Sequence, residues 1–181
     1  MTPEIDHLII AADTLADGVV WCERTLGVTP GPGGRHALMG THNRLLNLSC
    51  AAHPLCYLEI IAVDTDAPPP GRPRWFGLDA RPPGPPQLWH WVVRAADLDV
   101  ARAGLRAEGL EPGEPVAASR GDLRWRLLLR DDGATLPGRP TLIEWDSPHP
   151  AAGMPASGLC LLNLQTAPRL AATLGERRLE A

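Results

Sequence analysis

The stretch Ile5-Asp6-His7-Leu8-Ile9-Ile10-Ala11 decides how the chain is organised, because its pattern returns in the second half of the sequence. It is an apolar run interrupted by one acid and one histidine, which predicts a buried strand. A helix is predicted next, from about Leu15 to Leu26, with Asp13 or Thr14 as its N-cap. Gly27 then ends that helix.

Three further strand candidates complete a first β-α-β-β-β module, which we predict to span residues 4–64. The cluster Gly31–Gly34 reads as a loop, because glycine and proline break regular structure. The strands are predicted at Arg35–Gly40, Arg44–Leu48 and Tyr57–Val63. The last of these is strongly apolar and carries a single acid, Glu59.

A Pro-rich connection over residues 65–87 separates this module from a second one, predicted over residues 88–147. Trp75-Phe76-Gly77-Leu78 is expected to anchor the connection. The second module repeats the order of the first, and its elements are predicted at Leu88–Arg94 (strand), Asp97 to about Glu108 (helix, ended by Gly109), Pro115–Ser119 and Leu123–Leu129 (strands turning at Arg120-Gly121-Asp122), and Thr141–Trp145 (strand).

The spacing of polar residues supports an internal repeat. His7 lies 52 residues before Glu59, and His90 lies 54 residues before Glu144. All four lie inside apolar strands. A C-terminal extension, residues 148–181, is expected to add a strand near Leu159–Gln165 and a turn or helix over Pro168–Leu174, within a single domain of residues 1–181.

Strand alternation places His7 with Ile5 and Ile9, Glu59 with Tyr57 and Ile61, His90 with Leu88 and Val92, and Glu144 with Leu142. A buried carboxylate is costly unless it is paired, protonated or bound to a metal. Two His and two Glu at equivalent strands supply ligands suited to a divalent metal such as Zn, Ni, Mn or Fe(II). The alternative is that each His hydrogen-bonds its Glu in a polar, metal-free pocket.

Other side chains are weaker candidates for the site. His42 and Asn43 either bind substrate at the cavity mouth or lie in a turn that satisfies backbone groups, and His36 is more readily explained by the turn. Arg124 and Arg126 share one strand face and either clamp an anionic substrate group or lie in solvent.

The roles of the remaining aromatic and loop residues are also left open by the sequence. Trp145, like Trp89 and Trp91, belongs to the core or forms a cavity wall, and His149 is expected in a surface loop.

Composition excludes several classes of function. The formal net charge of −4, with scattered arginines, argues against nucleic acid and anionic membrane surfaces. No apolar run reaches the roughly 20 residues that span a bilayer, and no secretory signal is evident, so we expect a cytoplasmic protein. The four cysteines form no regular framework and are expected to be reduced thiols.

The chain resembles glyoxalase-like domain proteins of the vicinal oxygen chelate superfamily, which includes glyoxalases, bleomycin-resistance proteins and dioxygenases. The resemblance rests on Ile5-Asp6-His7-Leu8, Gly33-Gly34-Arg35-His36, Gly40–Leu46, Tyr57–Ala62, Arg120–Arg126 and Leu142–Trp145. It implies an α+β fold of paired βαβββ modules in a curved mixed sheet around a cavity. It also implies metal ligands at His7, Glu59, His90 and Glu144, as in metal-dependent members.

The leading hypothesis is therefore a metal-dependent lyase, isomerase or dioxygenase that chelates a small oxygen-bearing substrate, with Glu144 or Glu59 as general base. The alternative is a metal-free protein that binds or sequesters a small molecule, as bleomycin-resistance proteins do. A structural homologue that binds a protein partner is a third possibility. The sequence leaves open whether the modules pair within one chain or across a homodimer.

Overall fold

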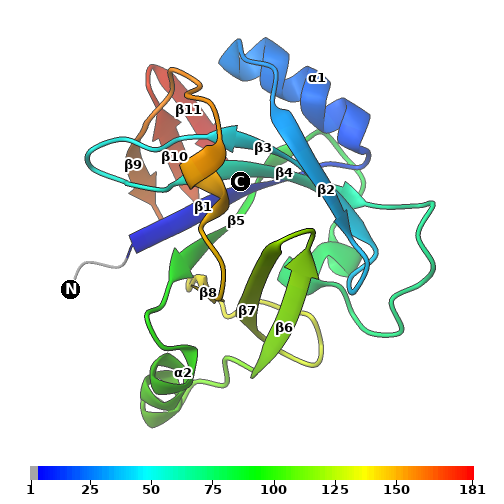
Figure 1. Cartoon of the computed structure of the whole chain (residues 1–181), viewed down its shortest axis with the longest axis vertical. Coiled ribbons are helices and arrows are strands. Elements are labelled where there is room, and N and C mark those ends of the chain that lie inside the picture. The colour runs from blue at the N-terminus through cyan, green and yellow to red at the C-terminus, as the bar shows by residue number, and fades with distance from the viewer. Residues whose placement is uncertain (1–3) are drawn as a thin grey trace.

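Two βαβββ units join into one curved sheet of eight strands, in the order β2-β3-β4-β1-β5-β8-β7-β6 (Figure 1). The computed structural model describes residues 4–181. The first unit consists of β1 (Glu4–Ala11), α1 (Leu15–Leu26), β2 (Gly31–His36), β3 (Thr41–Asn47) and β4 (Tyr57–Val63). The second consists of β5 (Gln87–Arg94), α2 (Leu98–Ala107), β6 (Glu114–Arg120), β7 (Leu123–Leu129) and β8 (Thr141–Trp145).

The two units repeat the same strand pairing, which confirms the predicted fold class. In the first, β1 runs parallel to β4, and in the second β5 runs parallel to β8. Strands β1 and β5 pair antiparallel and form the seam between the units, so both modules pair within one chain. The helices follow the predicted caps: the Thr14 side chain accepts from the Asp17 N–H, and Gly27 ends α1 with φ +75°.

The sheet has an outer and an inner apolar face. Helix α1 packs on the outer face, where Cys22 and Leu26 join a core cluster with Leu8, Leu58 and other buried strand residues. The inner face holds a second cluster that includes Ile9, Ile61 and Ile143. Period-two alternation along the strands explains both, because successive side chains point to opposite faces.

Two register shifts interrupt the β1–β5 seam, and each turns two neighbouring side chains to the inner face. One lies between Ile5 and His7, and the other between Ile9 and Ile10, opposite Trp89. At such a bulge one strand carries an extra residue and bends. The predicted grouping of His7 with Ile5 is therefore wrong, because Ile5 packs against the outer cluster whereas Ile9 belongs to the inner one.

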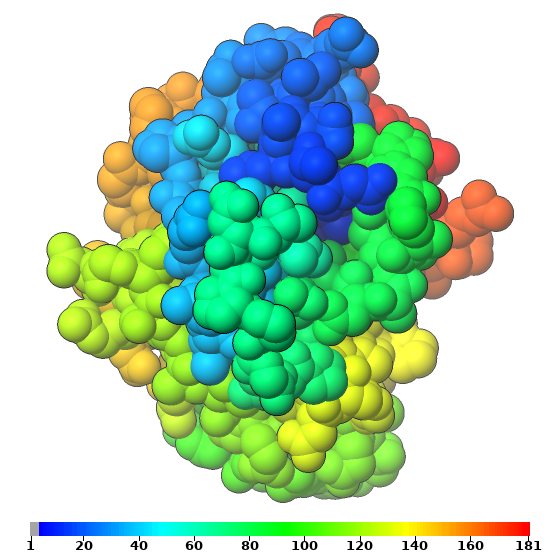
Figure 2. Space-filling model, turned by 90° about the vertical axis from the view of Figure 1, so that its right-hand side faces the viewer, coloured from blue at the N-terminus to red at the C-terminus, as the bar shows by residue number. Residues whose placement is uncertain are grey.

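The Pro-rich connection is anchored in the inner face. Its 3₁₀ turns over Trp75–Ala80 bury Trp75, Phe76 and Leu78 in the inner cluster. Figure 2 shows the connection in aquamarine across the middle of one face of the molecule. This burial agrees with the expectation that the aromatic segment anchors the connection.

Strand β2 corrects the predicted loop at Gly31–Gly34. The glycines are paired in the sheet because they allow a close approach to β3: a Cβ at Gly33 would lie 2.1 Å from the backbone oxygen of Asn43. Glycine in a strand marks such approaches. The loop prediction failed because it weighed glycine only as a breaker.

The C-terminal extension contains no helix from Pro168 to Leu174, contrary to the predicted turn or helix. It forms a three-stranded antiparallel sheet of β9 (Leu161–Gln165), β10 (Ala171–Leu174) and β11 (Arg177–Glu180), preceded by a 3₁₀ turn over Pro150–Gly153. Leu161, Leu174 and Leu179 pack into the outer cluster. Strand pairing and this burial override the local helical pattern.

The expectation of four reduced cysteines is wrong for two of them. Cys50 and Cys160 form a disulfide with a Cα–Cα distance of 5.8 Å, whereas Cys22 and Cys56 are free and buried. The partners are 110 residues apart in sequence, so spacing alone could not pair them. Within residues 4–181, no helix has the length and apolar character needed to cross a membrane.

Two glycine substitutions should separate packing from helix propensity. Gly18→Ala should destabilise the fold by about 1–3 kcal/mol, because its Cβ would lie 2.3 Å from Cγ2 of Ile60 under α1. Gly104→Ala in α2 should stabilise it by about 0.5–1 kcal/mol, since no neighbouring atom lies within 4 Å of the new Cβ. Urea unfolding measures both, and equal effects of the two changes would contradict this packing.

Candidate functional site

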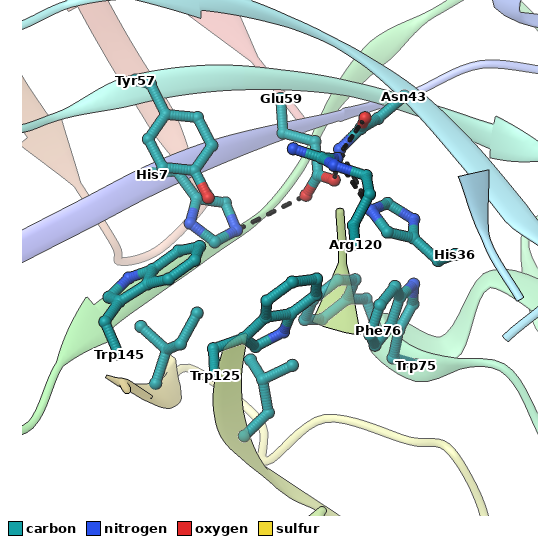
Figure 3. Close-up of a pocket in the computed structure, with 12 residues that line it drawn as sticks. His7, His36, Asn43, Tyr57, Glu59, Trp75, Phe76, Arg120, Trp125 and Trp145 are labelled. Atoms are coloured by element: carbon teal, nitrogen blue, oxygen red, sulfur yellow. Dashed lines mark hydrogen bonds and ion pairs between the residues drawn. The ribbon is translucent and has the colours of Figure 1, made fainter. Parts of the chain in front are cut away.

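A pocket lies on the inner face, between the seam and the two outer hairpins of the sheet (Figure 3). Most of its wall is aromatic, and its charged groups gather on one side. It is lined by His7, His36, Asn43, Tyr57, Glu59, Trp75, Phe76, Arg120, Trp125, Leu127, Ile143 and Trp145. The cavity volume is about 30 Å³. The pocket therefore holds about one or two waters in this conformation, and a larger ligand must move a side chain.

A chain of three buried ionisable groups runs along one wall of the pocket. Asp6 Oδ1 lies 2.6 Å from Nδ1 of His7, and His7 Nε2 lies 3.4 Å from Oε2 of Glu59. Asp6 is fully buried, and the other two are at most 5% exposed. The bulge in β1 explains how the adjacent residues Asp6 and His7 contact each other on the inner face.

The three groups shift one another's pKa strongly. Burial alone would lower the pKa of His7, but its contacts with the Asp6 and Glu59 carboxylates outweigh burial and raise that pKa to about 9. Burial alone would raise the pKa of Glu59, but contact with His7 outweighs it and lowers the pKa to about 2. The pKa of Asp6 is also held far below its usual value, against the effect of burial, by His149 and His7. At neutral pH the wall therefore carries a protonated imidazole between two carboxylates.

Asn43 connects Glu59 to the opposite hairpin. Its Nδ2 donates to Oε1 of Glu59 at 2.5 Å, and its Oδ1 accepts from Arg120 Nη1 at 2.7 Å and from the Gly34 N–H at 3.0 Å. Arg120 Nη1 also lies 3.1 Å from His36 Nε2. Burial lowers the pKa of His36 to about 4, so this ring is neutral and accepts the bond. These contacts join the two βαβββ units across the pocket (Figure 3).

A second set of contacts holds Asp6 from the other side. Trp145 Nε1 donates to Asp6 Oδ2 at 2.9 Å, and His149 Nε2 lies 3.0 Å from the same oxygen. The Ala151 N–H donates to His149 Nδ1, so Nε2 is the donor to Asp6. The surface-loop prediction for His149 is therefore wrong: the chain folds back after β8, and His149 is 9% exposed.

Two of the four predicted metal ligands meet, and two lie elsewhere. His7 and Glu59 face each other in the pocket. His90 Nε2 instead accepts from the Thr141 N–H at 3.1 Å, and its ring lies beside Phe76, with 5.8 Å between ring centroids. Phe76 lines the pocket and His90 does not.

Glu144 points to the face opposite the pocket. Its neighbours Ile143 and Trp145 line the pocket, so strand alternation turns Glu144 away. There it accepts two bonds of 2.9 Å from Arg126, and its Oε2 accepts from the Leu98 N–H at the start of α2. The predicted grouping with Leu142 agrees with this, but the assumption that this face forms the cavity was wrong.

The remaining predicted substrate-binding residues divide in the same way. Asn43 and Trp145 line the pocket. His42 precedes Asn43 on β3 and lies on the other face, and Arg126 is bound to Glu144. Arg124 is exposed and bonds the backbone oxygen of Asp122. The structure therefore does not bring His42, Arg124 or Arg126 to the site, because each alternates with a residue that faces inward.

The donor set does not fit the expected four-ligand metal site. Both His7 nitrogens face carboxylates within this wall, His90 Nε2 is occupied by a backbone N–H, and Glu144 is committed to Arg126. Across residues 4–181, no three His, Cys, Asp or Glu side chains are grouped in a way that could hold a metal ion. The duplicated spacing arises from the repeated strands, whereas the bulges and strand faces separate the side chains.

Several site residues were missed from the sequence. The sequence places Arg120 in a turn, although it ends β6 and faces inward. It marks Asp6 and Tyr57 only as neighbours of His7 and Glu59. The adjacent pair Asp6-His7 inside an apolar strand was the available signal, because two consecutive polar residues in a buried strand indicate a bulge. Nothing in the sequence indicates that Trp125 forms a pocket wall rather than part of the core.

The two βαβββ units in one curved sheet are the fold that the resemblance to the vicinal oxygen chelate superfamily implies. The family model for the glyoxalase-like domain matches residues 5–177, and the chain belongs to this family. No protein of curated function matches.

Among solved structures, one similar fold is a single-substitution variant of Streptomyces coelicolor methylmalonyl-CoA epimerase in complex with 2-nitronate-propionyl-CoA, at 20% identity and TM-score 0.54, covering 80% of this chain and 98% of that one. Another is a methylmalonyl-CoA epimerase with methylmalonyl-CoA and NH4+, at 18% identity and TM-score 0.51, covering 78% and 94%. A hypothetical protein from Bacillus halodurans C-125 matches at 13% identity and TM-score 0.52, covering 80% and 94%. These similarities show the fold.

The buried chain of charges predicts a pH-dependent stability. Because folding raises the pKa of His7 from 6.5 to about 9, its contribution is complete below pH 6.5 and is lost as the pH rises through about 9. The free energy of unfolding should fall by at most about 3 kcal/mol across this window. Urea unfolding of the wild type and His7→Gln measures it, and the variant should show a flatter curve.

The matched control is His42→Gln, which removes a ring on the opposite face of the sheet and should keep the wild-type slope. A wild-type curve as flat as that of His7→Gln would contradict the assigned role of His7.

Proposed function

We propose that this chain binds a small molecule and has an isomerase-type function, in which Glu59 and His7 move a proton on a substrate held in the aromatic pocket. The observation that carries the proposal is the buried Asp6–His7–Glu59 chain, whose His7–Glu59 end opens into the pocket. Membership of the glyoxalase-like family and a fold similar to that of epimerases support an isomerase-type function.

The contact between His7 and Glu59 explains how binding would activate both groups. At 3.4 Å it is longer than an ordinary hydrogen bond. A substrate oxygen placed between the two would weaken their contact, which is what keeps the pKa of Glu59 low. Burial then raises the pKa of Glu59, while the pKa of His7 falls. The pKa values of the base Glu59 and the acid His7 thus move closer together when substrate is bound.

The proposed step is a proton transfer beside a carbonyl group. Glu59 Oε2 removes a proton from the carbon next to the carbonyl, and the carbonyl oxygen receives a hydrogen bond or a proton from His7 Nε2. Asn43 holds the other Glu59 oxygen, and Asp6 holds His7 Nδ1. Return of the proton to the opposite face of the carbon, with the oxygen giving any proton it received back to His7 Nε2, gives the epimer, and all atoms balance without an added reactant.

Solvent exchange tests this step directly. We expect the wild type to accelerate deuterium exchange at C3 of phenylpyruvate or at the benzylic carbon of phenylacetone above the buffer rate, followed by NMR in D2O. Glu59→Gln and His7→Asn should each lower the protein-dependent rate by about 100-fold or more. Glu144→Gln, on the other face of the sheet, is the matched control and should retain it.

The same assay separates this proposal from the metal-dependent lyase, isomerase or dioxygenase that the sequence suggested. Protein dialysed against EDTA should exchange at the wild-type rate. A rate lost on dialysis and restored by one of Zn, Ni, Mn or Fe(II) would overturn the proposal, as would full activity in Glu59→Gln.

A second candidate is a protein that binds or sequesters a small molecule without turnover, and the aromatic walls favour it. Trp125 and Trp145 lie with 5.4 Å between ring centroids, and Tyr57 stacks on His7 at 4.6 Å. Such surfaces hold flat ligands by stacking. Tight ligand binding by wild type, Glu59→Gln and His7→Asn alike, with no exchange by any of them, would select this function.

A further inference from the structure

Arg120 brings to the pocket a positive charge that has no ion-pair partner. None of the ion pairs formed within residues 4–181 includes it, and its two hydrogen-bond partners, Asn43 and His36, are neutral. Both bonds come from Nη1, so Nη2 and Nε have no protein partner among the described residues. A guanidinium presents a planar fork of donors that matches a carboxylate. Arg120 therefore has the free donors that an anionic ligand needs.

The surrounding structure holds Arg120 over the pocket rather than in solvent. The stem of its side chain crosses Gly34 of the other unit so closely that a Cβ there would lie 2.5 Å from Cδ of Arg120. Gly34 has no positive φ, so the glycine serves this approach and not the backbone conformation. The two-residue turn at Gly121 and Asp122 fixes the end of β6 from which Arg120 reaches.

The charges of the pocket sum to zero, so a ligand with one negative charge costs less free energy to bind there than a ligand with two. Asp6 and Glu59 contribute two negative charges, and His7 and Arg120 contribute two positive ones. A monoanion leaves one excess negative charge, and a phosphate dianion leaves two beside the buried Glu59, which is costly at low dielectric. Without Arg120 the pocket itself is already negative, so an anion depends on this residue.

The lining of the pocket also contains a residue with a buried donor that has no partner. Trp75 lines the pocket and is 3% exposed, and its indole Nε1 has no hydrogen-bond partner. Native structures seldom bury such a donor unsatisfied. The Trp75 ring lies against His36, with 5.0 Å between centroids, and His36 in turn contacts Arg120. His36 thus lies between Arg120 and Trp75 on this side of the pocket (Figure 3).

We infer that Arg120 determines the specificity of this pocket, and that its ligand is a small molecule with a flat apolar body and one carboxylate. Trp125, Trp145 and Phe76 take the apolar body, and the Arg120 fork takes the carboxylate. The ligand enters by displacing the Arg120 guanidinium from Asn43 and His36, which are both uncharged. The inference rests on the proposed function, because it concerns the ligand of the same pocket.

Two probes that differ only in charge test the inference. Phenylacetate and phenylacetamide are titrated into the protein, and quenching of the pocket tryptophans reports binding. Phenylacetate should bind at least about tenfold more tightly to the wild type. Arg120→Gln should remove this preference by weakening phenylacetate binding about tenfold or more, while phenylacetamide binding changes less than about twofold.

Three further variants keep the test independent of folding defects. Arg120→Lys retains the charge but loses the fork, and should bind phenylacetate with an intermediate affinity. Gly34→Ala should weaken phenylacetate binding by displacing the Arg120 side chain. Arg124→Gln, on the same hairpin but exposed, is the matched control and should bind both probes as the wild type does. Circular dichroism and thermal unfolding verify that each variant is folded.

Equal affinity of the wild type for the two probes, a preference that survives Arg120→Gln, or no binding of either probe at millimolar concentration would overturn the inference. The outcome is separate from that of the exchange assay. Carboxylate-selective binding without exchange would leave the inference standing and remove the proposed function. Exchange of phenylacetone and phenylpyruvate at equal rates, both unaffected by Arg120→Gln, would leave the proposed function standing and remove the inference about Arg120.

Discussion

The antiparallel seam between β1 and β5 is the constraint on which the rest of the structure depends. It joins the two βαβββ units into one sheet, and its register shifts turn neighbouring side chains to the inner face. The shift beside His7 places Asp6 and His7 together in the interior. A regular strand would have separated them by alternation, and Asp6 would have entered the apolar outer cluster.

Buried charge of this kind is stable only when it is fully partnered. Each Asp6 oxygen is held by at least one donor, from His7, Trp145 or His149, and Glu59 is held by His7 and Asn43. The contacts come from both units and from the segment after β8, so the site requires the complete fold. That dependence places the ionisable groups on rigid strands, which suits a site that must keep acid and base in register.

The repeat accounts for both the success and the failure of the site prediction. His7 and His90 do lie on equivalent strands, and both face inward. The aromatic segment Trp75–Ala80 fills the inner face beside His90, however, while the equivalent region beside His7 remains open as the pocket. Glu59 and Glu144 also occupy equivalent strands but point to opposite faces. A duplicated backbone therefore carries one asymmetric site.

The sequence by itself determined the two modules, both helices with their caps, the apolar strands and the pairing of His7 with Glu59 as one of two alternatives. These follow from local periodicity, capping and spacing, which short stretches of chain encode. Only the tertiary structure decided which face of each strand became the cavity, that Arg120 crosses Gly34 into it, and that Cys50 meets Cys160. The physical reason is that register shifts and contacts between distant segments depend on how whole strands pack, and a one-residue shift reverses every side chain.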